Sequence, residues 1–463
     1  MEVFVLPSSD EIKKYSATVC EQVRWKKVHA GIAKEIEDHL CDQRDSYLSE
    51  GEEEEAATQK AILQMGDPIH VGIELDKTHK PKPQWLLILL TMALMLVGIG
   101  GSYILDGSDT SVRTFSIFPY LLAIVIFFVA YFLDFTTLAK YPKAFYFTIL
   151  FLSMAALPVA SNINGRSFFF FAGFSFSLSY FALIFPLAYA MLLYAMRNKG
   201  PRGILLCGIG SIPYGIILLL VPSVTGFVLY ALTALTLLFT AIRKGWFGGS
   251  KRQGYLMFLP VALSAIAVMT IFALQPSQSV RFKILLNPSS DPRGYQTAMI
   301  RDLMSGAVWI GKGATPAQFD DPVLSIPGIN TDHVLTVLTH NYGWIVFIGI
   351  TLLFIAFSAF GFYYVFKQRS VLGLMVSLSI LMTFVMQFVL YMADNLGYGL
   401  LSSLSLPLVS YGRAALFLNA GLIGIMLSVF RTGDVIRDGF QPFTKNASFL
   451  SYEDGKLIIN LKG

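Results

Sequence analysis

Charged residues are scarce in this chain. Only 14% of its 463 residues are Asp, Glu, Lys or Arg, whereas 54% are hydrophobic and the mean hydropathy is +0.60. Soluble globular proteins carry about 25% charged residues, so this composition excludes an ordinary soluble fold. The charges also concentrate in the first 80 positions and in short breaks between apolar runs. We therefore predict a soluble amino-terminal segment followed by a membrane-embedded body.

Cysteine is equally scarce, with three residues in the whole chain. Cys20 and Cys41 lie in the polar amino-terminal segment, Cys207 lies inside an apolar run, and no CxxC spacing suggests zinc. We expect unpaired thiols. The net charge of +5 does not indicate nucleic-acid binding, because the basic residues flank apolar runs, where membrane topology accounts for them. The polar amino terminus predicts that no signal peptide is cleaved.

Residues 1–80 are predicted to form a small helical domain. Ile32, Ile36 and Leu40 recur at helical spacing between charged residues. A second helix is predicted to start at the glutamate run 52–55, because acidic side chains suit the positive end of a helix dipole. Two interpretations of this run remain open: an acidic recognition patch, or the solvated start of that helix.

Ten apolar segments follow, each close to the roughly 20 residues that a helix needs to cross a bilayer. They lie near residues 85–105, 115–135, 144–163, 175–196, 203–221, 223–242, 255–275, 342–366, 371–394 and 405–430. The predicted fold is therefore an all-α membrane protein with about ten transmembrane helices over residues 81–432. The segment before it is the cytoplasmic helical domain, and residues 433–463 form a cytoplasmic tail.

Lysine and arginine gather in alternate loops, which indicates the orientation of the chain. With a cytoplasmic amino terminus, the inner loops hold Lys140, Lys143, Arg197, Lys199, Arg202, Arg243, Lys244, Lys251, Arg252, Lys367, Arg369 and Arg431. The short outer loops hold few basic residues, among them Arg166. The positive-inside rule therefore predicts a multi-pass plasma-membrane protein with both termini cytoplasmic and the long segment 276–341 outside.

The long segment 276–341 is dense in turn-forming and aromatic residues. It contains the stretches 287–296 (NPSSDPRGYQ), 311–313 (GKG) and 330–332 (NTD). A flexible linker does not need this composition, so we expect an ordered loop that folds back over the membrane surface. The GKG stretch lacks the surrounding pattern of a phosphate-binding loop.

The last apolar segment opens with residues 404–413 (LSLPLVSYGR). Pro407 is predicted to lie within the first turns of the last helix, near where proline is tolerated. Arg413 is then expected about two turns into the helix, on the outer side. An arginine at that depth is costly unless it is paired or hydrated. It is therefore either a functional residue or a side chain that reaches out to the interface.

These motifs resemble those of the shape, elongation, division and sporulation family, whose members include FtsW, RodA and SpoVE. The resemblance rests on LSLPLVSYGR, with Asn419 and Gly424 after it, and on NPSSDPRGYQ, GKG, Pro327 and NTD in the family's order. It covers about residues 85–432. The amino-terminal 80 residues instead resemble the helical prefix of some Gram-positive permeases.

The resemblance implies a peptidoglycan glycosyltransferase for cell elongation, division or sporulation. Such proteins polymerise lipid II, a disaccharide-pentapeptide on undecaprenyl pyrophosphate, at the outer membrane face. They lie in membrane lipid and act with a class B penicillin-binding protein. Asp332 falls on the family's proposed catalytic aspartate, so it is the predicted base for the attacking sugar hydroxyl. From the residues alone, Thr331 or Asp332 is instead a cap for the helix expected after them, and both roles are compatible.

Other residues of these motifs are candidates for binding the substrate. They are Gln296, Arg281, Lys312, Asn330, Thr331, Ser410, Tyr411 and Arg413. His333 and His340 lie on either side of an apolar run, without a third ligand at suitable spacing, so no metal site is predicted. No cofactor is firmly implied, and a divalent cation such as Mg²⁺ is the one left open.

The chain departs from the family at charged positions. Leu324 and Ser402 stand where the family pairs a glutamate with a lysine, and His340-Asn341 replaces its glutamate pair. Arg413 stands where the family has glycine, and we hypothesise that it supplies the missing positive charge. The alternative function is therefore a non-catalytic lipid II binder, scaffold or lipid-linked precursor transporter. A solute permease is disfavoured, because few ionisable residues lie mid-membrane.

Overall fold

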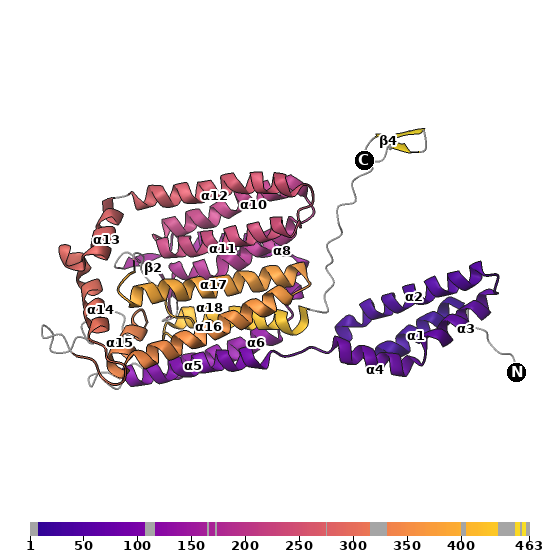
Figure 1. Cartoon of the computed structure of the whole chain (residues 1–463), viewed down its shortest axis with the longest axis horizontal. Helices are drawn as coiled ribbons and strands as arrows, with labels where there is room; N and C mark the ends of the chain where they lie inside the picture. The colour runs from indigo at the N-terminus through magenta and orange to yellow at the C-terminus, as the bar shows by residue number, and fades with distance from the viewer. Residues whose placement is uncertain are drawn as a thin grey trace. The chain divides into compact units, whose positions relative to one another are not determined.

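The computed structural model describes residues 8–106, 116–163, 166–171, 174–274, 276–314, 331–399, 404–433, 450–453 and 456–459. The chain divides into two compact units, Met1–Lys82 and Pro83–Gly463, close to the domain boundary placed at residue 80 from the sequence. The second unit is the membrane body, a bundle of long helices (Figure 1).

The described part of the amino-terminal unit is helical. Its elements are α1 (Ser8–Gln22), η1 (Lys26–Val28), α2 (His29–Ser49), α3 (Glu54–Met65) and α4 (Pro68–His79). The two helices expected from the sequence correspond to α2 and α3, whereas α1 and α4 were not predicted. Val19, Leu40 and Ala57 are fully buried in this unit. Helix α4 starts where the Asp67 carboxylate accepts the backbone N–H of His70 at 3.1 Å, as an N-cap does.

The described part of the membrane unit contains ten apolar helices, one for each predicted span. They are α5 (Trp85–Asp106), α6 (Phe118–Phe132), α8 (Pro142–Ala156), α9 (Phe181–Ala195), α10 (Gly200–Leu220), α11 (Val224–Arg243), α12 (Lys251–Ala273), α16 (Trp344–Lys367), α17 (Val371–Asn395) and α18 (Arg413–Thr432). Eight spans are long and apolar enough to cross a bilayer, and α6 and α8 are shorter, with 15 residues each. The prediction of an all-α membrane protein is confirmed.

The loop between α8 and α9 contains a small antiparallel sheet that was not predicted from the sequence. Its strands are β1 (Ser161–Ile163), β2 (Arg166–Phe171) and β3 (Phe174–Ser177), followed by the 3-10 helix η2 (Leu178–Tyr180). The predicted spans 144–163 and 175–196 therefore extend too far into this loop. Hydropathy misled the prediction because residues 157–160 (LPVA) before β1 are apolar, and because β3 contains phenylalanine, which favours strands as well as apolar helices.

The last membrane helix, α18, begins at Arg413 and not at residue 405. Residues 404–412 are not helical, and Leu408 among them has a φ of 64°. Residues other than glycine rarely adopt this left-handed conformation, and Pro407 before it offers no N–H to a helix. The predicted placement of Pro407 inside the helix, and of Arg413 two turns into it, is therefore wrong. Arg413 is instead the first residue of α18 and is exposed.

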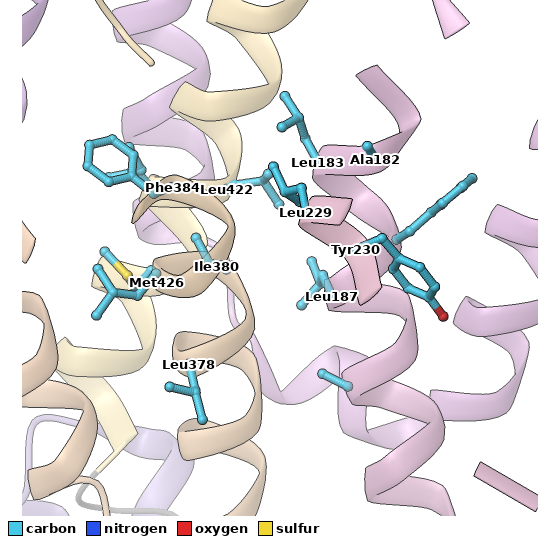
Figure 2. Close-up of a cluster of buried hydrophobic side chains, with 14 of the residues drawn as sticks. Ala182, Leu183, Leu187, Leu229, Tyr230, Leu378, Ile380, Phe384, Leu422 and Met426 are labelled. Atoms are coloured by element: carbon cyan, nitrogen blue, oxygen red, sulfur yellow. The ribbon is translucent and has the colours of Figure 1, made fainter. Parts of the chain in front are cut away.

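The core of the membrane unit lies where α9, α17 and α18 pack together. The buried share of their apolar stretches is 72%, 83% and 67%, against 0% for α12 at the edge of the bundle. Figure 2 shows this core, in which Leu183 and Leu187 of α9 lie with Leu229 of α11, Phe384 of α17 and Leu422 of α18. These buried helices provide a rigid frame for the helix ends that carry the candidate site.

The described part of segment 276–341 is ordered and largely helical, as expected from its composition. It contains α13 (Pro276–Leu286), η3 (Pro288–Ser290), η4 (Pro292–Gly294), α14 (Tyr295–Ser305) and most of α15 (Val334–Tyr342). Figure 1 places α13, α14 and α15 at one end of the bundle, where β2 also lies. The remaining elements are α7 (Thr136–Lys140), β4 (Leu450–Glu453) and β5 (Lys456–Ile459).

Candidate active site

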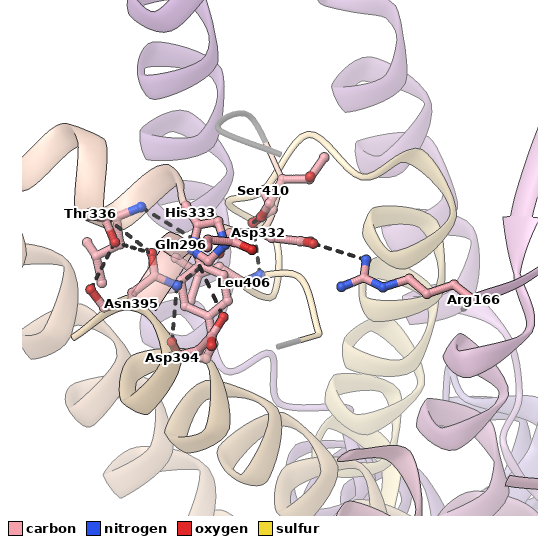
Figure 3. A network of polar contacts seen from close by, with 12 residues as sticks. Arg166, Gln296, Asp332, His333, Thr336, Asp394, Asn395, Leu406 and Ser410 are labelled. Atoms are coloured by element: carbon pink, nitrogen blue, oxygen red, sulfur yellow. Dashed lines mark hydrogen bonds and ion pairs between the residues drawn. The ribbon is translucent and has the colours of Figure 1, made fainter. Parts of the chain in front are cut away.

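Asp332 lies in a short turn, residues 331–333, directly before α15. Its Oδ2 accepts a hydrogen bond from Nη1 of Arg166 at 3.0 Å, and its side chain is 17% exposed (Figure 3). The predicted cap by Thr331 or Asp332 is wrong, because His333 is the N-cap residue of α15 and no side-chain cap bond forms there. Asp332 is therefore part of a partly exposed ion pair and not a capping residue.

The small sheet brings Arg166 to Asp332. Arg166 is the first residue of β2, and its pairing with Ile163 of β1 fixes its backbone. Its side chain is 43% exposed, so the ion pair contributes little to stability, typically about 0–1 kcal/mol. From the sequence, Arg166 counted only as one of the few basic residues in the outer loops. The scarcity of basic residues in the outer loops was the one sequence feature that could have indicated a specific role for Arg166.

The turn that carries Asp332 is held by the end of α17. The fully buried Asn395 donates from Nδ2 to the backbone carbonyl of Asp332 at 2.9 Å. Its Oδ1 accepts the backbone N–H of Thr336 at 3.2 Å and the Thr336 hydroxyl at 3.0 Å. Thr336 is the third residue of α15, and its N–H is one that an N-cap side chain ordinarily satisfies. A residue of α17 thus caps α15, which explains why the turn provides no cap of its own.

His333 follows Asp332 and is almost completely buried, with 4% of its surface exposed. Its Nε2 lies 2.6 Å from the side-chain amide nitrogen of Gln296 on α14, and its Nδ1 lies 4.0 Å from the carboxylate of Asp394 on α17 (Figure 3). Burial lowers the pKa of His333, against the opposite effect of the Asp394 and Asp332 carboxylates. Burial therefore favours the neutral imidazole, which contacts Gln296 of the loop helix α14 and faces Asp394 of α17 without a hydrogen bond to it.

Residues 404–412 support the same turn from another direction. Ser410 donates its hydroxyl hydrogen to the carbonyl of Thr331 at 2.6 Å and accepts the backbone N–H of Leu406 at 2.9 Å. The hydroxyl of Tyr411 accepts the backbone N–H of Ser116 at 3.0 Å. Both predicted substrate-binding hydroxyls thus bond to backbone groups, and Ser410 is the one that holds the turn.

The structure does not bring every predicted residue into this network. Arg281 on α13 and Lys312 in the turn after α14 are exposed, and neither forms a hydrogen bond or ion pair with another described residue. The same is true of Arg413 at the start of α18. Four positions singled out from the sequence lie outside the described residues: Leu324, Pro327, Asn330 and Ser402.

Arg301 of α14 makes a set of contacts that was not predicted. Its Nε donates to the carbonyl of Gly397 at 2.8 Å and its Nη2 to that of Leu285 at 2.5 Å. Its guanidinium also lies 4.7 Å from the ring centre of Tyr398. Arg301 therefore ties α13 and α14 to the chain just beyond α17, beside the helix end that holds Asp332.

The described residues around Asp332 contain no cluster of metal-ligating side chains. No group of three or more His, Cys, Asp or Glu side chains suitable for a metal ion occurs in the described ranges. The Asp332 carboxylate is engaged by Arg166, and the Asp394 carboxylate faces His333. Mg²⁺ is usually bound by one or two carboxylates with substrate phosphates, and in the described part of the chain these two carboxylates already face other side chains. No step of the reaction proposed below is assigned to a metal.

The fold and the site define a class of protein: a polytopic membrane protein with a partly exposed aspartate–arginine pair at one end of a bundle of ten apolar helices, beside a partly helical loop. A family model described as "Cell cycle protein", covering FtsW, RodA and SpoVE, matches residues 83–434. The chain belongs to this family, as its motifs predicted. The amino-terminal 82 residues lie outside the match.

Individual relatives share low identity over long stretches. A probable peptidoglycan glycosyltransferase FtsW of Polynucleobacter necessarius is 23% identical, over 80% of this chain and 90% of that protein. Stage V sporulation protein E of Bacillus subtilis is 24% identical, over 76% of this chain and 98% of that protein.

Solved structures share the fold. A chain from a structure of a peptidoglycan synthase complex that coordinates polymerization and crosslinking has a TM-score of 0.59 and 22% identity, over 76% of this chain and 98% of that one. An aspartate-to-alanine variant of the rod shape determining protein RodA from Thermus thermophilus has a TM-score of 0.51 and 17% identity over the same shares. At such identities the likeness establishes the fold.

Proposed function

We propose that this protein is a peptidoglycan glycosyltransferase that polymerises lipid II in cell elongation, division or sporulation. Its family and the names of its relatives support this function, in agreement with the sequence prediction. The observation that carries the proposal is the setting of Asp332. Its carboxylate is partly exposed and paired with a cation, on a turn fixed by α17 and by residues 404–412.

Asp332 is the proposed general base. The hydroxyl oxygen of the acceptor sugar attacks the anomeric carbon of the donor, and a glycosidic bond forms as the bond to the pyrophosphate oxygen breaks. The hydroxyl proton passes to the Asp332 carboxylate, and undecaprenyl pyrophosphate leaves with the electron pair of the broken bond. A positioned base of this kind accelerates a reaction by about 10²–10⁴-fold.

Two arginines are proposed to bind the pyrophosphate, whose developing charge needs cations nearby. Arg166 contacts Asp332 through Nη1, which leaves the rest of its guanidinium fork for a second anion. Arg413 places a positive charge at the N-terminus of α18, where the helix dipole disfavours a cation but favours a bound anion. The role hypothesised for Arg413 alone is thus shared with Arg166.

The proposed orientation puts this site at the outer face of the plasma membrane and both termini in the cytoplasm. It rests on the basic residues of the loops at the other end of the helices, such as Lys140, Arg202 and Arg252. A class B penicillin-binding protein is the proposed partner. The match to a chain from a peptidoglycan synthase complex supports such an assembly.

Purified protein in liposomes, with and without a co-purified transpeptidase, tests the proposal when supplied with lipid II. Wild type is expected to form glycan chains and Asp332→Ala none, whereas Asp291→Ala, at an exposed salt bridge of the same loop, keeps full activity. Lipid II binding is measured in parallel. Binding without polymer in the wild type establishes the non-catalytic alternative, and polymer made by Asp332→Ala refutes the assignment of the base.

A further inference from the structure

The turn after α14, residues 306–314, exposes an apolar tip. The exposed fractions are 42% for Val308, 73% for Trp309 and 75% for Ile310. Three consecutive large apolar side chains left in water are unfavourable, and such groups mark a contact with an apolar environment. The tip therefore needs an explanation outside the fold itself.

The tip is held rigidly against the junction of α15 and α16. Five backbone hydrogen bonds fix the turn: Gly311 N–H to Tyr342 C=O, Gly313 N–H to His340 C=O, Trp344 N–H to Val308 C=O, Ile345 N–H to Trp309 C=O, and Ala314 N–H to Gly306 C=O. A Cβ at Gly343 would come within 2.5 Å of the Trp309 carbonyl oxygen, so the two backbones are in close contact. The exposure of the tip is thus built into the fold.

The position of the tip relative to α16 indicates what it faces. This spanning helix exposes a stripe formed by Ile345, Ile348, Leu352 and Ile355, at the spacing of one helix face. An exposed apolar stripe on a spanning helix faces lipid. Because Ile345 is hydrogen-bonded to Trp309, the tip continues this stripe at the level where α16 enters the bilayer.

We infer that Val308-Trp309-Ile310 is an interfacial membrane anchor, inserted into the lipid leaflet at the site end of the bundle. Tryptophan suits this depth, because its ring is apolar and its N–H reaches the polar layer. Lys312 on the same turn is exposed, and its ammonium is available to lipid headgroup phosphates. The bilayer, and not lipid II, is then the partner of Lys312.

The anchor has a consequence for the site. Helix α14 ends at Ser305, just before the tip, and carries Gln296, which contacts the buried His333. Lipid insertion of the tip therefore holds α14 at a fixed height over the turn that contains Asp332. The inference requires no catalytic activity, so it stands or falls separately from the proposed function.

The fluorescence of Trp309 reports whether the tip lies in lipid. Full-length wild type and Trp309→Phe are reconstituted in phosphatidylcholine–phosphatidylglycerol vesicles whose acyl chains are brominated either near the headgroup or near the chain end. The difference between the two emission spectra isolates Trp309, and phenylalanine preserves the apolar tip. Shallow bromine is expected to quench this signal severalfold more than deep bromine, with little quenching by aqueous acrylamide. Trp246→Phe isolates a buried tryptophan as a control that quenchers reach poorly.

Three results would overturn the anchor. A Trp309 signal that acrylamide quenches and bromolipids do not would show a tip in water. A signal that neither reagent reaches would show a tip covered by protein, either a partner or a second copy of the chain. Equal results for the Trp309 and Trp246 signals would also contradict lipid insertion.

Discussion

The capping of α15 by Asn395 makes a quantitative prediction about how the site is held together. Asn395→Ala removes the acceptor for the Thr336 N–H and the donor to the Asp332 carbonyl. The Thr336 hydroxyl keeps its bond to the Asn395 backbone carbonyl at 2.9 Å. Two groups therefore lose a partner, at about 1–3 kcal/mol for each one left buried. We expect the start of α15 to be destabilised by about 2–6 kcal/mol.

Hydrogen exchange measures this loss. Amides in residues 334–338 that open locally are expected to exchange roughly 30-fold to 2 × 10⁴-fold faster in Asn395→Ala, at about 1.4 kcal/mol per factor of ten. The rate of glycan polymerisation is expected to fall in the same variant, because the turn that carries Asp332 is no longer held in place. Ser379→Ala on the same helix is the matched control, since its buried hydroxyl bonds only to the carbonyl of Val376 within α17. Unchanged exchange in Asn395→Ala would refute the account of the cap.

Three further predictions concern other contacts of the site end. Arg166→Gln is expected to lower kcat/KM for lipid II by about 10²-fold, and Arg166→Lys by less, in steady-state polymerisation assays. Because burial lowers the pKa of His333, the unfolded state binds a proton that the folded state excludes as pH falls below about 6.5. The melting temperature is thus expected to fall as the pH is lowered below that value. His333→Gln should make the melting temperature depend less on pH. Gly343→Ala, at a φ of 97° and against the Trp309 carbonyl, is expected to cost about 1–3 kcal/mol and to speed proteolysis of the turn. Gly349→Ala, where a Cβ meets nothing within 4 Å, is expected to be neutral or stabilising.

The sequence located the membrane helices well, because hydropathy sums a property of single residues over a long window. Their ends were harder to place. Residues 404–412 are as apolar as the helix that follows, and only the left-handed backbone of Leu408 after Pro407 shows that the helix has not begun. Likewise, the apolar residues 157–160 extended one predicted span into β1, and the next span began inside β3, whose phenylalanines suit both strands and membrane helices.

The site was only partly predictable, because its key contacts join distant parts of the chain. The resemblance located Asp332, since its motif is contiguous. Local spacing then suggested that the same turn caps α15, whereas the actual cap is Asn395, 59 residues from Thr336. Arg166 belongs to no motif and is 166 residues from Asp332, so only the folded sheet reveals the pair.

The central claim is that Asp332 and Arg166 form one reaction centre. The most direct test is the initial rate of glycan polymerisation from lipid II by wild type, Asp332→Asn, Arg166→Gln and the double variant. Asp332→Asn is expected to lose about 10²–10⁴-fold. The double variant should lose little more, because residues that act as a unit are not additive. Losses that multiply, or a wild-type rate for Asp332→Asn, would contradict the claim.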